Sequence, residues 1–544
     1  MEKFMRFISG CFAKEIVGRD GCPQPSALRQ DSGLAAVWGH TALPVIFLTG
    51  ITAAALSQAE PEQPNILFLF SDDHAVQAIG AYGSKINKTP NIDRIAESGV
   101  VFDRNYCANS ICGPSRACIL TGKHSHKNGF LSNDNKFDTS QFLFPAALQE
   151  AGYHTALIGK WHLYTTPRGF DEWMIYPGQG FYYNPDYISP EGTNRITGYS
   201  VEITTDLALD YLKRRNDEGG PFLLMCQYKA PHRQWLPGPK YLDLYNDVEI
   251  PEPDTLFDDY KNRATPASQH KMGIGEHLRM EADLLIPPSM SLEWSRMTPG
   301  QQSLFEESFL KQNAQIHPES MAGEDLTRMK YQRYIKDYLR CVAAVDDNVG
   351  RILDYLKESG LDRNTIVVYS ADQGFYLGEH GWFDKRWMYE ESFRMPLLVR
   401  WPGKTVPGTR SSALTQNIDF APTFLEAAGV PIPEDVQGES LVPLLKGERP
   451  ADWRDALYYH YYHYPSVHHV ARHYGVRTDR CKLIHYYNTD EWELFDLQKD
   501  PQELNSVYNN PEYAQVQQQL TAKLTQLREQ YDVPEDNCMS ELRK

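Results

Sequence analysis

The chain has few cysteines for its length, and they are not spaced as a framework. Nine cysteines occur among 544 residues, and no two form a CxxC pair, which excludes a zinc-ribbon protein and a small disulfide-stapled domain. Internal repeats and low-complexity segments are also absent from the sequence. Basic residues are outnumbered, with 54 Lys and Arg against 71 Asp and Glu, so the net charge is −17. Nucleic acid and anionic membrane surfaces are therefore poor partners, and an anionic substrate would need a local positive pocket.

The N-terminus carries an apolar run over residues 41–56 that is shorter than a membrane span. Small residues at positions 57 and 59 follow it, as in a signal-peptidase site. We expect residues 1–59 to be a signal peptide with an atypically long N-terminal extension. The mature chain would then be exported, periplasmic or secreted, with no stable membrane association. The alternative is an N-terminal membrane anchor.

The chain as a whole has the composition of a soluble globular protein, with 41% hydrophobic and 23% charged residues. Its length predicts two or more domains. Residues 331–356 repeat apolar side chains with a period close to 3.6, which predicts a helix. Continuous apolar runs, typical of strands buried on both faces, alternate with such helical patterns. These runs are residues 65–70, 155–159, 222–226 and 365–370. We expect an α/β domain over residues 60–445, with a large doubly wound, mostly parallel sheet flanked by helices.

Two segments break this alternation. Residues 236–328 are rich in proline, methionine and charge, and predict an insertion over one end of the sheet, either a substrate-pocket lid or a plain surface excursion. Residues 446–544 predict an α+β subdomain in which a small antiparallel sheet packs with a final helix at 513–531. Its four short β-prone runs are residues 457–462, 473–477, 482–487 and 492–497.

The run from Cys112 to Arg116 reads Cys-Gly-Pro-Ser-Arg. Pro114 suits the first turn of a helix, and the exposed amides of that turn favour anions. The run therefore suits the presentation of one reactive group better than a packed core. The alternative is a buried free cysteine, the usual fate of a lone thiol.

Oxygen-bearing side chains follow two of the predicted strands directly. Asp72 and Asp73 end the first, and Asp372 and Gln373 end the last. Because ligands gather beyond the carboxyl ends of strands in a doubly wound sheet, we expect these side chains to meet. Separate oxygen donors are what Ca²⁺ or Mg²⁺ requires. For either pair alone, helix N-capping is the competing interpretation.

Basic and imidazole side chains follow the same strand ends. Lys160 and His162 come after the second strand, His232 after the third, and Lys385 after the last. Converging on one edge of the sheet, they would offset the charge of an anionic group and supply proton donors.

The Cys112 run, the Gly-Lys-Trp-His element at 159–162 and the acidic pairs resemble the formylglycine-dependent sulfatases, an arylsulfatase-like family of the alkaline phosphatase superfamily. The resemblance covers about residues 62–500. It implies that Cys112 is oxidised to formylglycine (3-oxoalanine) by a formylglycine-generating or anaerobic sulfatase-maturating enzyme. It also implies one divalent cation, Ca²⁺ rather than Mg²⁺. Its ligands would be Asp72, Asp73, Asp372, Gln373 and the oxygen of modified Cys112. Many members have asparagine at the position of Gln373. The glutamine retains the amide oxygen that would bind the cation.

The resemblance also implies catalytic roles. Arg116 and Lys123 would orient and activate the formylglycine hydrate, one hydroxyl of which attacks sulfur. Lys160, Lys385 and His232 would hold the sulfate and its bridging oxygen, and either His232 or Lys385 would protonate the departing alcohol. His162 would accept the proton of the second hydroxyl as sulfate is expelled.

The stretch over residues 458–465, with His468, Arg472 and His473, is dense in aromatic and basic groups. It reads either as an edge strand with a solvated loop or as a substrate-binding sugar subsite. The stretch looks like that of bacterial sulfatases acting on 6-O-sulfated N-acetylglucosamine in glycosaminoglycan or mucin-type glycans. Three alternatives stay open: a sulfatase for galactosamine, uronate or algal sugars, a phosphate or phosphonate ester hydrolase of the same superfold, and an inactive protein that binds sulfated glycans.

Overall fold

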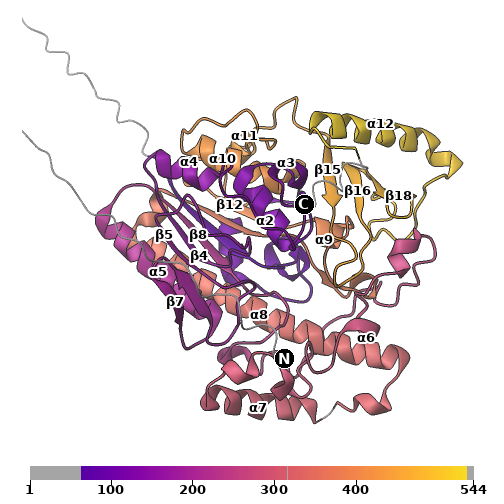
Figure 1. Ribbon diagram of the computed structural model, residues 1–544, viewed down its shortest axis with the longest axis horizontal. Coiled ribbons are helices and arrows are strands. Elements are labelled where there is room, and N and C mark those ends of the chain that lie inside the picture. The colour runs from indigo at the N-terminus through magenta and orange to yellow at the C-terminus, as the bar shows by residue number, and fades with distance from the viewer. Residues whose placement is uncertain (1–62, 315, 536–544) are drawn as a thin grey trace, which may run out of the picture. The chain divides into compact units, whose positions relative to one another are not determined.

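A computed structural model describes residues 63–314 and 316–535 of the chain (Figure 1). The predicted signal peptide at 1–59 lies outside the described residues, so it stays a prediction. Within the described ranges, no helix is both long enough and apolar enough to cross a membrane.

Ten strands form one large sheet in the order β13-β2-β12-β9-β1-β8-β4-β5-β6-β7. The four predicted strands are its centre and are parallel to one another, which confirms the mostly parallel sheet. They are β1 (Asn65–Ser71), β4 (His154–Gly159), β8 (Phe222–Tyr228) and β9 (Thr365–Ala371). The outer strands are β2 (Val100–Phe102), β5 (Glu172–Ile175), β6 (Asp186–Ser189), β7 (Gly192–Arg195), β12 (Leu397–Arg400) and β13 (Thr409–Ser411). Two short pairs stand apart, β3 (Asn105–Tyr106) with β14 (Thr415–Gln416) and β10 (Tyr376–Leu377) with β11 (Phe383–Asp384).

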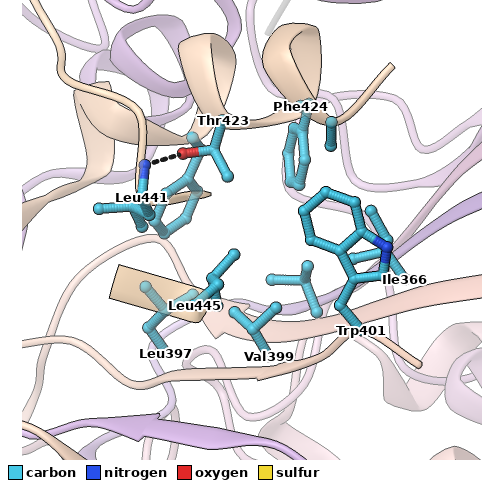
Figure 2. Close-up of a pocket in the computed structure, with 11 residues that line it drawn as sticks. Ile366, Leu397, Val399, Trp401, Thr423, Phe424, Leu441 and Leu445 are labelled. Atoms are coloured by element: carbon cyan, nitrogen blue, oxygen red, sulfur yellow. Dashed lines mark hydrogen bonds between the residues drawn. The ribbon is translucent and has the colours of Figure 1, made fainter. Parts of the chain in front are cut away.

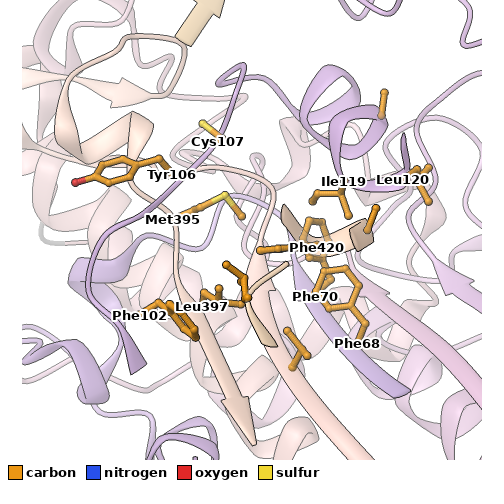
Figure 3. Close-up of a cluster of buried hydrophobic side chains, with 14 of the residues drawn as sticks. Phe68, Phe70, Phe102, Tyr106, Cys107, Ile119, Leu120, Met395, Leu397 and Phe420 are labelled. Carbon is orange, nitrogen blue, oxygen red and sulfur yellow. The ribbon is translucent and has the colours of Figure 1, made fainter. Parts of the chain in front are cut away.

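The large sheet is buried on both faces, as its continuous apolar strands predict. Along β1, Phe68 and Phe70 point into one core cluster while Leu67 and Leu69 point into another. Figure 3 shows Phe68 and Phe70 in the first cluster with Phe420 from a helix on that face. Alternate side chains of one strand thus anchor two layers of helices, which confirms the doubly wound architecture.

The helices divide between these two faces. The first cluster takes side chains from α2 (Cys112–Thr121), α4 (Phe144–Glu150) and α10 (Phe420–Ala427). The second takes them from α1 (Pro90–Glu97), α5 (Ser200–Glu218) and α8 (Gly323–Ser359), and α8 carries the predicted 3.6-residue pattern. The remaining helices are α3 (Ser125–Asn128), α6 (Ile274–His277), α7 (Pro299–Asn313), α9 (Glu390–Phe393), α11 (Val442–Leu445) and α12 (Ala514–Gln530).

A small cavity of about 10 Å³ lies within the first face, between β9, β12 and α10 (Figure 2). Ile366, Val399 and Phe424 are among its walls, and no charged residue lines it. A space of this size and lining is a packing void and offers no chemistry. The functional groups must therefore be sought at the strand ends.

The C-terminal segment is a four-stranded antiparallel sheet in the order β15-β16-β17-β18, with α12 packed against it, as predicted (Figure 1). Its strands are β15 (Ala456–Tyr461), β16 (His473–Thr478), β17 (Cys481–Tyr486) and β18 (Glu491–Asp496). Leu520, Leu524 and Leu527 of α12 bury one face of the sheet. Tyr459 and Ile484 on the other face join the core of the large domain. The boundary between residues 445 and 446 remains a prediction.

Candidate active site

Two neighbouring strands bring the predicted acidic residues together. Ser71 of β1 pairs with Ala371 of β9, so the residues that follow, Asp72 and Asp372, leave the sheet side by side. The ligand atoms of Asp72, Asp73, Asp372 and Cys112 all lie within 4.8 Å of one another. All four side chains are buried. The strand register therefore assembles three carboxylates around the thiol.

Helix α2 places Cys112 at its first residue, as the Cys-Gly-Pro-Ser-Arg run predicts. Ser115 donates a hydrogen bond to the carbonyl of Asp372, and Asn417 donates to the Ser115 hydroxyl at 2.8 Å. Gly113 lets these elements approach closely, because a Cβ atom here would lie 2.7 Å from the side chains of Asn133 and Phe130 and would displace them. The helix start is thus locked onto the strand end that carries the acids.

The donor set fits a hard divalent cation. The Asp72 Oδ1 and Gln373 Oε1 atoms are buried and have no hydrogen-bond partner. Burial, together with the charges of Asp72 and Asp372, raises the pKa of Asp73 to about 8 although Lys385 acts against it. Burial and the charge of Asp72 likewise raise the pKa of Asp372 to about 6. Carboxylates crowded in this way would be stabilised by a cation, and all the donors except Cys112 are oxygens, as Ca²⁺ and Mg²⁺ prefer.

Three basic side chains surround the carboxylates. The Lys160 ammonium contacts Asp72, and the Lys385 Nζ atom lies 2.6 and 2.7 Å from the two carboxylate oxygens of Asp73. Arg116 donates to Asp372 at 3.2 Å and approaches Asp72 at 3.8 Å. With a cation added, the site would carry the local positive charge that an anionic substrate needs in an acidic protein.

Two histidines join the cluster. The His232 Nε2 atom lies 3.8 Å from Asp73, and His232 forms a group within 4.8 Å with Asp72 and Cys112. His162 is buried beside the start of α2, its carbonyl oxygen 3.2 Å from where a Gly113 Cβ would be. Burial first, and then Lys160, hold the pKa of both imidazoles well below the usual value. Both rings are therefore neutral at neutral pH, and each keeps a nitrogen lone pair.

The Cys112 thiol is not an activated nucleophile as it stands. Burial raises its pKa to about 11, although Lys160 and Lys385 pull it down. Reactive cysteines have depressed pKa values, because the thiolate is the attacking species. The thiol of Cys112 is protonated and lies among basic groups that could bind an anion. These properties fit a precursor that must be converted before it reacts.

Three predicted residues lie apart from the cluster. Lys123 follows the C-terminus of α2, where its ammonium pairs with Asp435. His473 is fully buried, accepts a hydrogen bond from the Met388 amide, donates one to the Ala471 carbonyl, and stacks on Trp387. Both residues thus lie outside the acidic cluster, and the roles of Lys123 in activation and of His473 in substrate binding stay predictions.

Arg472 donates to the carbonyls of Tyr462 and Tyr464 and lines a separate cavity of about 200 Å³. Asp134 and His463 also line it and pair with each other at 2.7 Å. This cavity adjoins the α2 start, because Asn133 of the same loop accepts from the Gly113 amide. A substrate contact for Arg472 stays a prediction.

His468 belongs to a second polar group that sequence reasoning found only in part. Its Nε2 atom lies 3.2 Å from Asp384, which also accepts from Arg386 at 2.9 Å. Asp384 and Arg386 flank Lys385, and all are buried. The Asp-Lys-Arg triplet was a signal for all three residues, yet it was read only for its lysine. Lys385 lies between Asp384 and Arg386 in the chain and contacts Asp73, which places this group beside the acidic cluster.

Residues of the insertion at 236–328 contact the polar group of Asp384, Arg386 and His468. Asp283 pairs with Arg233 at 2.7 Å, and the Arg233 guanidinium lies 3.5 Å from His468. The Lys271 carbonyl accepts from the other ring nitrogen of His468 at 2.9 Å. These contacts make the insertion a wall beside the site and favour a role in the pocket over a plain surface excursion.

Comparison with known proteins places this geometry among close relatives. A family model described as Sulfatase matches residues 64–430, and one described as N-sulphoglucosamine sulphohydrolase, C-terminal, matches residues 378–530. The chain is 47% identical over 506 residues to an N-acetylglucosamine-6-O-sulfatase of Bacteroides thetaiotaomicron, covering 90% of each chain.

Solved structures give the same picture. One structure, of a protein in complex with its substrate D-glucosamine-2-N,6-O-disulfate, has a TM-score of 0.85 and 46% identity, covering 87% of this chain and 99% of that one. A phosphonate monoester hydrolase from Silicibacter pomeroyi has a TM-score of 0.66 at 23% identity, covering 86% of this chain and 96% of that one. The second likeness concerns the fold alone.

Proposed function

The chain belongs to the sulfatase family, and from this premise we propose that it hydrolyses the 6-O-sulfate ester of N-acetylglucosamine in glycosaminoglycan or mucin-type glycans. The relative named as an N-acetylglucosamine-6-O-sulfatase, at 47% identity over 90% of both chains, supports this substrate. So does the solved relative, whose bound substrate is a glucosamine carrying a 6-O-sulfate.

One observation carries the proposal. Cys112 and the carboxylates of Asp72, Asp73 and Asp372 lie within 4.8 Å of one another, and two lysines contact this group. A buried group of acids serves no packing purpose and is costly unless a cation and an anionic ligand complete it. Sulfate-ester hydrolysis uses both.

The nucleophile and the cation are part of the proposal. Formylglycine made from Cys112 by a maturation enzyme would supply a hydrated aldehyde as nucleophile. Ca²⁺, held by Asp72, Asp73, Asp372 and Gln373, would neutralise charge on the sulfate oxygens. Gln373 suits this role because its Oε1 atom is buried without a partner.

The protein's own side chains would divide the work on the substrate. Lys160 and Lys385 lie where they can neutralise sulfate oxygens, because each is buried and contacts an acid of the cluster. The departing alcohol needs a proton, and Lys385 already carries one, because Asp73 raises its pKa well above the usual value despite burial. His232 donates from Nδ1 to the Arg233 carbonyl, so its Nε2 must first be protonated. Lys385 is therefore the better-placed general acid.

Asp384, Arg386 and His468 would bind the sugar. They are buried, interlinked and adjacent to Lys385. Charged groups held by one another are well placed to exchange hydrogen bonds with ring hydroxyls, and they exclude sugars that lack those hydroxyls. This pocket is the feature of the site that would distinguish one sulfated sugar from another.

The proposal is tested by sulfate release from matured enzyme. N-Acetylglucosamine-6-sulfate is compared with sulfated N-acetylgalactosamine, sulfated uronates and glucosamine-6-phosphate. We expect kcat/KM to be highest for the first compound. Release from galactosamine or uronate sulfates alone would overturn the substrate, and preferential release of phosphate would overturn the reaction. Binding of the sulfated sugar without any release would identify a glycan-binding protein.

We also propose that the chain is exported, because the apolar run at 41–56 and the small residues after it form a signal-peptidase site. N-terminal sequencing of the native protein tests this, with Glu60 as the expected first residue. Retention of the first 59 residues would instead indicate a membrane anchor.

A further inference from the structure

One buried histidine of the site has partners on only one of its ring nitrogens. The Nε2 atom of His162 lies 3.0 Å from the Tyr164 hydroxyl and 3.1 Å from the Gln179 carboxamide nitrogen. The Nδ1 atom is buried and has no hydrogen-bond partner among the described residues. The ring is therefore fixed along its Nε2 edge, and Nδ1 is the nitrogen left for the charged groups of the site.

We propose that Tyr164 and Gln179 are positioning residues that hold His162 in the tautomer with hydrogen on Nε2 and a lone pair on Nδ1. The inference rests on the proposed function, in which His162 accepts the proton that the nucleophile gives up as sulfate is released. While Nε2 donates to its two neighbours, only the Nδ1 lone pair can accept that proton. The two residues would thus act through His162 and would not touch the reacting atoms.

The charges around His162 favour this tautomer. One carboxylate, Asp72, and three cations, Lys160, Arg116 and Lys385, act on the ring, so the cations outnumber the anion. A lone pair directed towards cations is stabilised, whereas an N–H in the same place is repelled. A buried N–H without an acceptor is also rarer than an acceptor without a donor. Both effects place the hydrogen on Nε2.

Both neighbours can receive that hydrogen. A tyrosine hydroxyl accepts as readily as it donates. The two ends of a carboxamide have nearly the same shape, so Gln179 can present its oxygen where its nitrogen is placed. As placed, the Gln179 carboxamide nitrogen faces Nε2 and its buried Oε1 atom has no partner, so this tautomer requires the carboxamide to turn and present that oxygen to the Nε2 hydrogen.

The local backbone explains how Tyr164 reaches the ring two residues before it. Both His162 and Tyr164 have a left-handed conformation, with φ values of 56° and 58°, which curls the chain after β4. The two rings meet with centroids 5.3 Å apart. Tyr164 remains 49% exposed, so its hydroxyl contributes little to packing, and Tyr164→Phe should fold normally. Gln179 approaches from the loop after β5, the neighbour of β4 in the sheet.

The tautomer can be read without turnover, in protein whose Cys112 is unconverted. Nitrogen NMR of histidine-labelled protein distinguishes the two forms, and His162→Ala identifies the resonance among 17 histidines. We expect hydrogen on Nε2 in the wild type and a mixture of tautomers in a Tyr164→Phe, Gln179→Leu double variant. Hydrogen on Nδ1 in the wild type would overturn the inference.

Kinetics of matured enzyme supply the second measurement. Tyr164→Phe keeps the ring, so it isolates the hydroxyl, and we expect kcat to fall about three- to tenfold, as loss of one hydrogen bond implies. KM should stay within about twofold, because the hydroxyl does not contact the substrate. Tyr355→Phe on α8 is the matched control and should leave both constants unchanged.

The outcomes separate the two proposals. An inactive wild type would defeat the proposed function, while the NMR result would still decide the tautomer. An active wild type with an unchanged Tyr164→Phe variant would defeat the positioning role alone. A change confined to KM would also defeat it, because it would show a direct contact with the substrate.

Discussion

At the scale of single residues, Cys112 differs from the other cysteines in its neighbours and not in its burial. Every cysteine of the described ranges is buried and unpaired. Cys118 lies on the same helix, within 3.6 Å of the Ser125 hydroxyl and 3.7 Å of the Asn128 amide, with no carboxylate beside it. Only Cys112 adjoins three carboxylates. This contrast provides a matched pair of substitutions.

Cys112→Ala should abolish turnover, by more than about 10³-fold in kcat, because it removes the precursor of the nucleophile. Its stability should change by no more than about 2 kcal/mol, since one small buried side chain is shortened. Sulfate release and thermal unfolding measure the two effects. Cys118→Ala is the control and should retain activity, and equal losses in the two variants would refute the role of Cys112.

The metal assignment can be tested at Gln373, whose Oε1 atom is buried without a partner. Chelation should lower activity, and added Ca²⁺ should restore it. Gln373→Leu removes one oxygen donor at similar volume, and we expect the affinity for Ca²⁺ to fall about tenfold or more. Calorimetric titration of chelated protein measures this. Gln77→Leu, at a partly buried glutamine outside the cluster, is the control, and full activity in excess chelator would contradict the assignment.

At the scale of elements, helix α2 decides which basic residues reach the site. Arg116 follows Cys112 by one helical turn, so both lie on the same face and Arg116 reaches Asp372. Lys123 lies beyond the helix end at Thr121. Ten helical residues span about 15 Å, which carries Lys123 away from the reacting group. The resemblance alone could not show this, because a sequence motif gives the order of residues and not the distance that a helix puts between them.

This placement predicts opposite results for two lysines. Lys123→Met should change kcat less than about threefold, because its ammonium pairs with the half-exposed Asp435 and contacts no acid of the cluster. Lys160→Met should lower kcat/KM by roughly 10²-fold or more, because a buried charge facing the substrate is lost. Steady-state kinetics of both variants measure the difference. A larger loss at Lys123 than at Lys160 would support the role that the resemblance gave it.

The strands that carry the site could be predicted because each is a continuous apolar run with its functional residues directly after it. Asp72 and Asp372 were found in this way. The edge strands were missed, since β7 is only four exposed residues and has no apolar pattern. The position of His473 could not be predicted, because the direction of its side chain depends on the register of β16, which turns it into the aromatic core.

The second polar group was beyond sequence reasoning for a different reason. Asp384 meets His468 across 84 positions, and Asp283 meets Arg233 from the insertion. Such pairs depend on how loops fold back over the sheet, which no local pattern encodes. Tyr164 and Gln179 were missed likewise, although Tyr164 stands two residues from a predicted histidine.

At the scale of the whole described chain, a buried charged network joins the insertion, the large sheet and the C-terminal sheet. His380 pairs with Asp258 of the insertion at 2.9 Å, and Arg263 reaches both His380 and the Glu503 carbonyl. Lys482 of the small sheet pairs with Glu503 at 2.7 Å. The network fixes the insertion that lies against Asp384, Arg386 and His468, so its protonation state affects the stability of the whole molecule.

His380 gives this network a pH dependence. Burial lowers its pKa, but the hydrogen bond to Asp258 and the interaction with Glu391 raise it further, to about 9. Because the folded pKa exceeds the unfolded value of about 6.5, the stabilisation is complete below about pH 6.5 and is lost as the pH rises through about 9. We expect the free energy of unfolding to decrease by about 2–3 kcal/mol over this window.

Chemical denaturation at several pH values measures this decrease, with His380→Gln as the comparison. The variant lacks the titrating group, so its stability should vary less between pH 6.5 and 9 than that of the wild type. Parallel pH profiles for the two proteins would show that His380 does not carry the effect.

The most direct measurement of the central claim is the dependence of activity on the conversion of Cys112. Protein is prepared with different converted fractions, counted by peptide mass, and assayed for sulfate release from 6-O-sulfated N-acetylglucosamine in the presence of Ca²⁺. The account predicts a rate proportional to the converted fraction, falling to zero with unconverted thiol. Full activity in unconverted protein, or none in fully converted protein, would contradict it.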